Sequence, residues 1–95
     1  MTRIRCRIGA DGYSVVSVGH AGSEQSCTAV SAILGALAGW VDNNSGRFTL
    51  DKGEAMIIFP KGDGADAVMD MTVIGLLQIQ KIAPDDVTVE IVCEE

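Results

Sequence analysis

The sequence has few basic residues, and it lacks an apolar run long enough to cross a bilayer. Its seven Lys and Arg residues stand against thirteen Asp and Glu residues, which gives a formal net charge of −6. Because nucleic-acid binding depends on clustered positive charge, we expect no nucleic-acid partner. The longest mostly apolar run extends only from Ala29 to Val41, whereas a membrane-spanning helix needs roughly 20 apolar residues. We therefore also expect no membrane partner.

Cysteine and histidine are too sparse for a disulfide framework or a zinc site. The chain has three scattered cysteines, an odd number, and one histidine, without the paired spacing of metal ligands. We expect reduced thiols, a cytoplasmic location, no metal and no cofactor. The segment 1–7 alternates arginine with apolar residues, so it lacks the apolar centre of a signal peptide.

The composition is that of a small folded protein. Hydrophobic residues make up 47% of the chain and charged residues 21%, which excludes an intrinsically disordered chain. At 95 residues the chain is long enough for one domain, which we expect to cover residues 1–95.

Hydrophobic periodicity predicts the order ββαββαβ. A two-residue period indicates strands at 3–8, 13–20 and 87–93, and short β-rich segments indicate two more at 47–50 and 56–59. A helical period begins after the polar loop 21–26 and ends at the turn 42–46, and it returns over 65–83. This order predicts an α+β sandwich of a mostly antiparallel sheet and two helices.

The same periodicity predicts which faces are buried. The first helix is expected to bury its larger residues, Val30, Ile33, Leu34, Leu37 and Val41. The residues on its opposite face are small: Ala29, Ala32, Gly35, Ala36 and Gly39. The second helix has a main apolar stripe, Val68, Met71, Gly75, Ile79 and Ile82. A second stripe of Val73, Ile74 and Leu77 leaves no polar face for water, which predicts a homodimer. The unbroken apolar run 56–59 predicts a strand that is covered on both faces.

Cys27 is the cysteine whose position favours chemistry. It falls in the first turn of the first expected helix, where unpaired N–H groups and the helix dipole favour a thiolate. His20 closes the second expected strand and can lie within hydrogen-bond reach of that thiol. Ser31 follows one helical turn later, and Glu24 lies in the loop or the first turn. Cys6 and Cys93, in phase with Ile and Val in strands, are expected to be small buried hydrophobes.

The pattern taken by itself also allows an interpretation without catalysis. In that interpretation His20 is a polar residue at a strand end, Cys27 is a packed helix starter and Ser31 is an ordinary helix hydroxyl. A single cysteine near a single histidine fits both interpretations.

A longer motif separates the two interpretations. The stretch from Gly19 to Ser31, Gly-His-Ala followed by Gly-Ser-Glu-Gln-Ser-Cys-Thr-Ala-Val-Ser, resembles the signature of the ribosomal-processing cysteine protease family, Prp. Members of that family have Gly-His-Ala after the second strand and Gly-x-Asp-x-x-Cys-x-Ala-Val-Ser at the start of the first helix. Here the loop after Gly-His-Ala is shorter, and Glu24 stands in place of the Asp.

The resemblance implies a cysteine endopeptidase with His20 as the base and Cys27 as the nucleophile. Ser31 and Glu24 would support the dyad, while Gly22 and Ser26 would form the loop and the oxyanion site, together with the backbone N–H of Cys27. The implied substrate is a protein: a large-subunit ribosomal protein that loses an N-terminal extension, or a phage capsid or scaffold protein. The alternative is a non-catalytic dimeric interaction module on the same fold.

Overall fold

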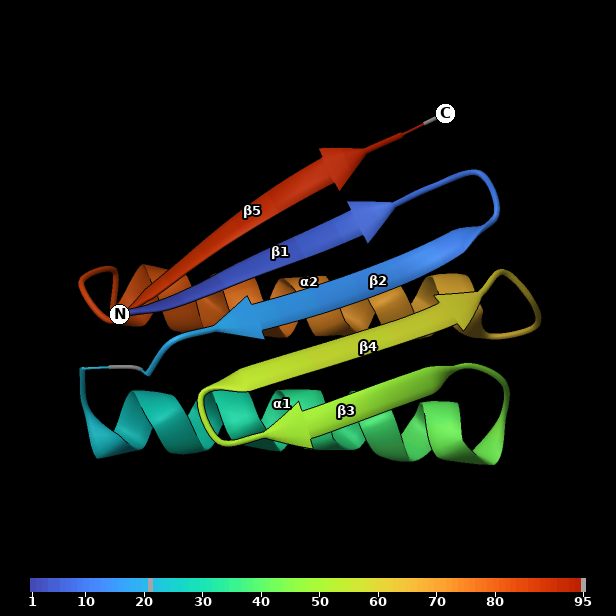
Figure 1. Ribbon diagram of the computed structural model, residues 1–95. Helices are drawn as coiled ribbons and strands as arrows, with labels where there is room; N and C mark the ends of the chain where they lie inside the picture. The colour runs from blue at the N-terminus through green and yellow to red at the C-terminus, as the bar shows by residue number, and fades with distance from the viewer. Residues whose placement is uncertain (21, 95) are drawn as a thin grey trace.

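The computed structural model describes residues 1–20 and 22–94, and in this part of the chain it confirms the predicted order ββαββαβ (Figure 1). The strands are β1 (Thr2–Ile8), β2 (Gly12–Val18), β3 (Arg47–Asp51), β4 (Glu54–Pro60) and β5 (Val87–Cys93). The helices are α1 (Glu24–Asn43) and α2 (Ala65–Ile82).

The described strands form one mixed sheet in the order β3-β4-β2-β1-β5. The hairpins β1–β2 and β3–β4 are antiparallel, and β2 pairs with β4 in the same way. β1 and β5 are parallel because α2 returns the chain before β5 begins. The predicted mostly antiparallel α+β sandwich is therefore confirmed.

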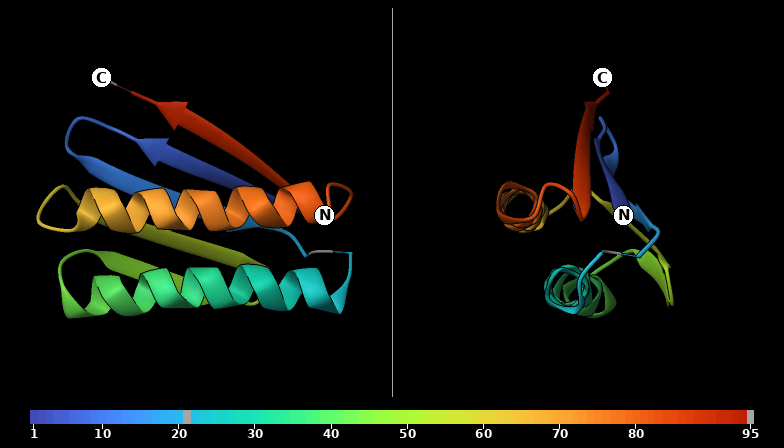
Figure 2. Two further views of the ribbon diagram at one scale, coloured as in Figure 1. Left: turned by 180° about the vertical axis from the view of Figure 1, so that it is seen from behind. Right: turned by 90° about the vertical axis from the view of Figure 1, so that its left-hand side faces the viewer.

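Both helices lie on the same face of the sheet, and the other face is open (Figure 2). The prediction that residues 56–59 are covered on both faces is therefore wrong. Ile57 is fully buried under the helices, but Met56 and Ile58 are half-buried on the open face. Met56 pairs in register with Val16, which pairs in turn with Arg5. Neighbouring side chains on the same sheet face thus shield these apolar residues, without a second layer.

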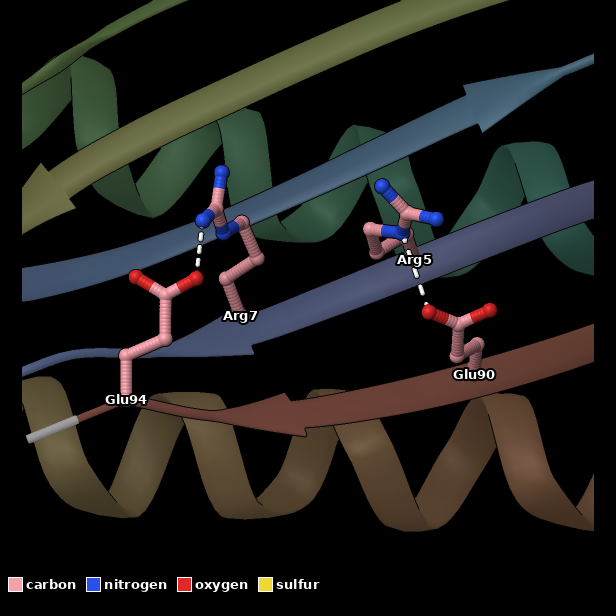
Figure 3. Close-up of polar contacts among 4 residues, drawn as sticks. All are labelled: Arg5, Arg7, Glu90 and Glu94. Carbon is pink, nitrogen blue, oxygen red and sulfur yellow. Dashed lines mark hydrogen bonds and ion pairs between the residues drawn. The ribbon is translucent and has the colours of Figure 1, made fainter.

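The open face has ion pairs at the β1–β5 edge of the sheet (Figure 3). Arg5 Nε lies 3.1 Å from Glu90 Oε1, and Arg7 pairs with Glu94. Arg5 and Glu90 are register partners on neighbouring parallel strands, and Glu94 directly follows the end of β5. Because the pairs are exposed to water, each stabilises the fold by at most about 1 kcal/mol.

The core lies between the sheet and the two helices. From α1 it takes Val30, Leu34, Leu37 and Val41, as predicted, while Ile33 is half-buried. From the sheet it takes Ile4, Cys6, Val15, Ile57, Phe59 and Val87. Burial raises the pKa of the Cys6 thiol from 9.0 to about 11, because the thiolate would lose its hydration there.

The predicted main stripe of α2 is only partly correct: Val68 and Ile79 are half-buried and pack against the core, but the other large residues of the stripe do not. The buried residues of α2 are Ala65, Met69, Thr72 and Leu76. Met71 is 70% exposed and Ile82 is 82% exposed. Gly75 contacts α1 instead of the sheet: a Cβ placed on it would lie 2.8 Å from Ile33 Cδ1. Since α2 packs on both α1 and the sheet, its buried face lies between the two apolar stripes that the sequence suggests.

Cys93 is exposed, so the prediction that it is a buried hydrophobe is wrong. It lies at the end of β5, opposite Ile8 of β1, and β5 is an edge strand. A two-residue period indicates which face a side chain takes, but not whether another layer covers that face at the sheet edge.

Candidate active site

His20 follows a sharp change of direction at the end of β2. The strand ends at Val18, two residues before the predicted end, because Gly19 has a φ of 98°. A side chain at Gly19 would also collide with the Met1 carbonyl oxygen. The Gly19 N–H donates to the Gly53 carbonyl oxygen at 2.8 Å. As a result, the exposed His20 imidazole lies against Gly53 in the turn between β3 and β4.

Cys27 lies in the first turn of α1, as predicted, although the helix begins at Glu24 and not after the loop 21–26. Ser23 is the N-cap: its Oγ accepts the Ser26 N–H at 3.1 Å. The Cys27 N–H donates to the Ser23 carbonyl oxygen at 3.1 Å. Both N–H groups are therefore already used inside the helix, and they are not available as oxyanion donors in this geometry. The Cys27 side chain is half-buried.

The structure brings His20, Cys27 and Ser31 to one small pocket of about 80 Å³. The β3–β4 turn closes one side of it with Asp51, Gly53 and Glu54. The rest of the lining comes from Thr2, Ser17, Gly19, Val30, Leu34 and Ala55. Within residues 1–20 and 22–94, the imidazole and the thiol share this pocket without a hydrogen bond between them.

The other predicted site residues lie outside the pocket lining. Glu24 is exposed at the first position of α1. Ser26 is buried, and its Oγ donates to Asp86 Oδ2 at 2.9 Å. Gly22 lies against the same carboxylate, because a Cβ there would come within 2.5 Å of Asp86 Oδ1. Ala21, part of the Gly-His-Ala motif, lies outside the described residues.

Sequence reasoning missed the β3–β4 turn and Asp86. Both look like ordinary turn residues, and each lies far along the chain from the motif; 60 positions separate Ser26 from Asp86. A local pattern gives no signal for such contacts, since only the sheet order brings β3–β4 beside β2.

Other features of the described residues do not offer comparable chemistry. A larger cavity of about 590 Å³ lies at the far end of β2, around Tyr13 and Pro60, but its lining has no cysteine or histidine. Across residues 1–20 and 22–94, no three His, Cys, Asp or Glu side chains gather closely enough to hold a metal ion. In that same part of the chain, neither helix combines the length and apolarity that a membrane crossing requires. The smaller pocket is therefore the candidate active site.

Solved structures share this fold over nearly the whole chain. SMU.848 from Streptococcus mutans superposes with a TM-score of 0.80 at 20% identity, covering 98% of this chain and 95% of that one. The essential ribosomal processing protease Prp from S. aureus, in complex with a covalently linked product peptide, gives a TM-score of 0.77 at 17% identity. That match covers 96% of this chain and 99% of the protease.

A hypothetical protein from Staphylococcus aureus also matches, with a TM-score of 0.71 at 15% identity over 96% of this chain and 99% of that one. No family model and no curated protein matches the sequence. The chain thus has a Prp-like fold. At these identities the likeness concerns the fold alone.

Proposed function

We propose that this chain is a cysteine endopeptidase in which Cys27 is the nucleophile and His20 is the general base. The supporting observation is that one pocket is lined by the chain's single histidine and by a cysteine in the first turn of a helix. The Prp-like fold adds support, because the S. aureus Prp structure contains a covalently linked product peptide.

In the proposed reaction, His20 takes the proton of the Cys27 thiol, and Sγ attacks the carbonyl carbon of a peptide bond. The tetrahedral intermediate collapses, His20 gives its proton to the leaving amine, and an acyl-enzyme remains. His20 then activates water, which releases the second product and restores the thiol. Because the Ser26 and Cys27 N–H groups are used within α1, the oxyanion requires other donors, such as the N–H groups of Glu24 and Gln25 at the start of the helix.

The proposed substrate is a protein segment, not a small molecule. The motif resemblance favours an N-terminal extension of a large-subunit ribosomal protein, or a phage capsid or scaffold protein. We propose that the reaction takes place in the cytoplasm, where the three cysteines would stay reduced. We further propose that residues 1–95 form a single catalytic domain, since the Prp-like fold spans nearly all of them.

Single-turnover cleavage of such candidate proteins tests the proposal. Wild-type protein in excess should cleave one site and form a thioester that mass spectrometry locates on Cys27. Cys27→Ala should abolish cleavage, and Cys93→Ala, which changes an exposed cysteine outside the pocket, should leave it unchanged. Equal cleavage by wild type and Cys27→Ala would refute the proposal. No cleavage by either protein would favour the alternative, a non-catalytic dimeric interaction module.

We also propose that the protein is a homodimer that pairs through its helical layer. The exposed large apolar residues of α2 are Met71, Ile74 and, at its end, Ile82, whereas Val73 and Leu77 are half-buried. Beside them runs a groove of about 440 Å³ between α1 and α2. On α1, a Cβ placed at Gly35 or at Gly39 would contact nothing within 4 Å.

These two surfaces are complementary in size. The large side chains of α2 in one copy fit the small-residue face of α1 in the other, and a two-fold axis makes this contact twice. Each large apolar residue buried in this way can contribute about 2 kcal/mol as an upper guide.

A further inference from the structure

A carboxylate from the opposite end of the chain holds the first turn of α1. Asp86 lies in the short connection between α2 and β5. Its Oδ2 accepts hydrogen bonds from Ser26 Oγ at 2.9 Å and from Ser23 Oγ at 3.0 Å. Both serines belong to the start of α1, directly before Cys27. The contact therefore joins the helix that carries the candidate nucleophile to a loop outside the candidate active site.

The two hydrogen bonds to Asp86 can form at the same time, with the Ser23 hydroxyl hydrogen directed to Asp86 and not to Ser26 Oγ, which lies equally close at 3.0 Å. Each serine hydroxyl has one hydrogen to donate, and a carboxylate oxygen has lone pairs for both. Ser23 Oγ remains an acceptor for the Ser26 N–H at 3.1 Å, so one hydroxyl caps the helix and binds Asp86 at once. Bonds to an ionised acceptor are stronger than bonds between neutral groups, and a negative charge is stabilised at a helix N-terminus.

Asp86 is itself fixed on both sides. Its backbone oxygen accepts the Thr2 N–H at 2.9 Å, and its own N–H donates to the Ala83 carbonyl oxygen at 3.0 Å. On the other side, its Oδ1 lies so close to Gly22 that a Cβ there would be only 2.5 Å away. Because β1 holds Asp86 and Asp86 holds the helix start, the first turn of α1 has a defined position relative to the sheet.

We propose that Asp86 is a positioning residue, which acts through Ser23 and Ser26 to keep Cys27 in the pocket beside His20. Asp86 does not line that pocket, so it acts only through the helix start. The inference rests on the proposed role of Cys27 as the nucleophile. A displacement of about 1 Å of a reacting group can reduce a rate by about 100-fold, so the loss of this clamp should lower kcat.

Three variants test the clamp. Asp86→Ala removes the acceptor, and Asp86→Asn keeps an acceptor oxygen but loses the charge. Asp85→Ala removes the same charge from the exposed neighbouring residue. For peptide cleavage we expect kcat to fall about 10- to 100-fold in Asp86→Ala with KM within about twofold, because the reacting groups and not the binding surface are displaced. Asp86→Asn should recover part of the rate, and Asp85→Ala should match wild type.

A double-mutant cycle shows whether the effect passes through the serines. Ser26→Ala should lower kcat as well, and the double variant with Asp86→Ala should be no slower than Asp86→Ala alone. If the reductions in kcat caused by Ser26→Ala and by Asp86→Ala multiplied fully in the double variant, the proposal would be overturned. A kcat in Asp86→Ala equal to that of Asp85→Ala would overturn it as well. If Asp86→Ala does not fold, Asp86→Asn and Ser26→Ala complete the same cycle.

Amide hydrogen exchange tests the clamp without using the protease activity. The Ser26 and Cys27 amides, which donate inside the first turn, should exchange at least about tenfold faster in Asp86→Ala, with the middle of α1 unchanged. Unchanged protection of both amides would refute the clamp. If wild-type protein cleaves no candidate substrate, the protease proposal falls, and hydrogen exchange alone then decides whether Asp86 fixes the helix start.

Discussion

The imidazole of His20 lies against Gly53, so closely that a Cβ on Gly53 would come within 2.7 Å of the imidazole Nε2. Gly53 also has a φ of 82°, a backbone conformation that residues with side chains rarely adopt. The turn between β3 and β4 thus supports one half of the candidate active site. The loop that contains Asp86 supports the other half, because it holds the helix start before Cys27.

Gly53→Ala should displace the imidazole and destabilise the turn. We expect the free energy of unfolding to fall by about 1–2 kcal/mol, since alanine is strained at positive φ. We also expect the His20 ring resonances to shift in a proton–carbon correlation spectrum. Gly62→Ala is the matched control, because a Cβ at that loop glycine would meet nothing within 4 Å. Unchanged His20 resonances in Gly53→Ala would contradict the contact.

The three cysteines should differ in their reaction with iodoacetamide at about pH 6.5, where only a small fraction of an ordinary thiol is ionised. We expect Cys27 to react faster than the exposed Cys93, and the fully buried Cys6 to react only after unfolding. His20→Ala should slow Cys27 to about the rate of Cys93, and should leave Cys93 unchanged. Mass spectrometry of the digested protein measures each rate. A Cys27 rate that does not depend on His20 would remove the histidine from the proposed dyad.

The homodimer predicts a sedimentation mass of twice the 10.0 kDa chain at micromolar concentration. Met71→Glu and Ile74→Glu should each shift the protein to the monomer, because both introduce charges into an apolar contact. Thr88→Glu, at an exposed position of β5 on the open face of the sheet and away from the helices, is the control and should leave the dimer intact. A wild-type monomer, or dimers of both charged variants, would refute the helical interface.

Stability should decrease at alkaline pH because of Cys6. Its pKa is raised by burial from 9.0 to about 11, so the native protein keeps this proton after the unfolded chain has lost it. The contribution is fully present below about pH 9 and is lost as the pH rises toward and through about 11. We measure the free energy of unfolding of wild type and of Cys6→Ala by urea unfolding across this pH range. As the pH rises, the value for wild type should fall relative to that for Cys6→Ala by about 2–3 kcal/mol. A constant difference between the two proteins would contradict the shift.

The chain's local patterns correctly predicted the element order, the sheet class and the buried face of α1. They also predicted that Cys27 lies in the first turn of a helix and that His20 lies at the end of the second strand, although this strand ends two residues earlier, at Val18. These predictions succeeded because periodicity, turn residues and helix capping depend on residues close together in the sequence.

Contacts between segments that are distant in the sequence determined which faces are covered and how the candidate active site is completed. One side of β4 is exposed because it lies on the open face of the sheet. The contact of Gly75 with Ile33 of α1 sets which face of α2 is buried. Cys93 is exposed because β5 is at the edge of the sheet. In the same way, the pocket is completed by the β3–β4 turn, and the start of α1 is held by Asp86. A side chain's sequence neighbours determine which face it takes, but only the packing of the sheet and helices determines what covers that face.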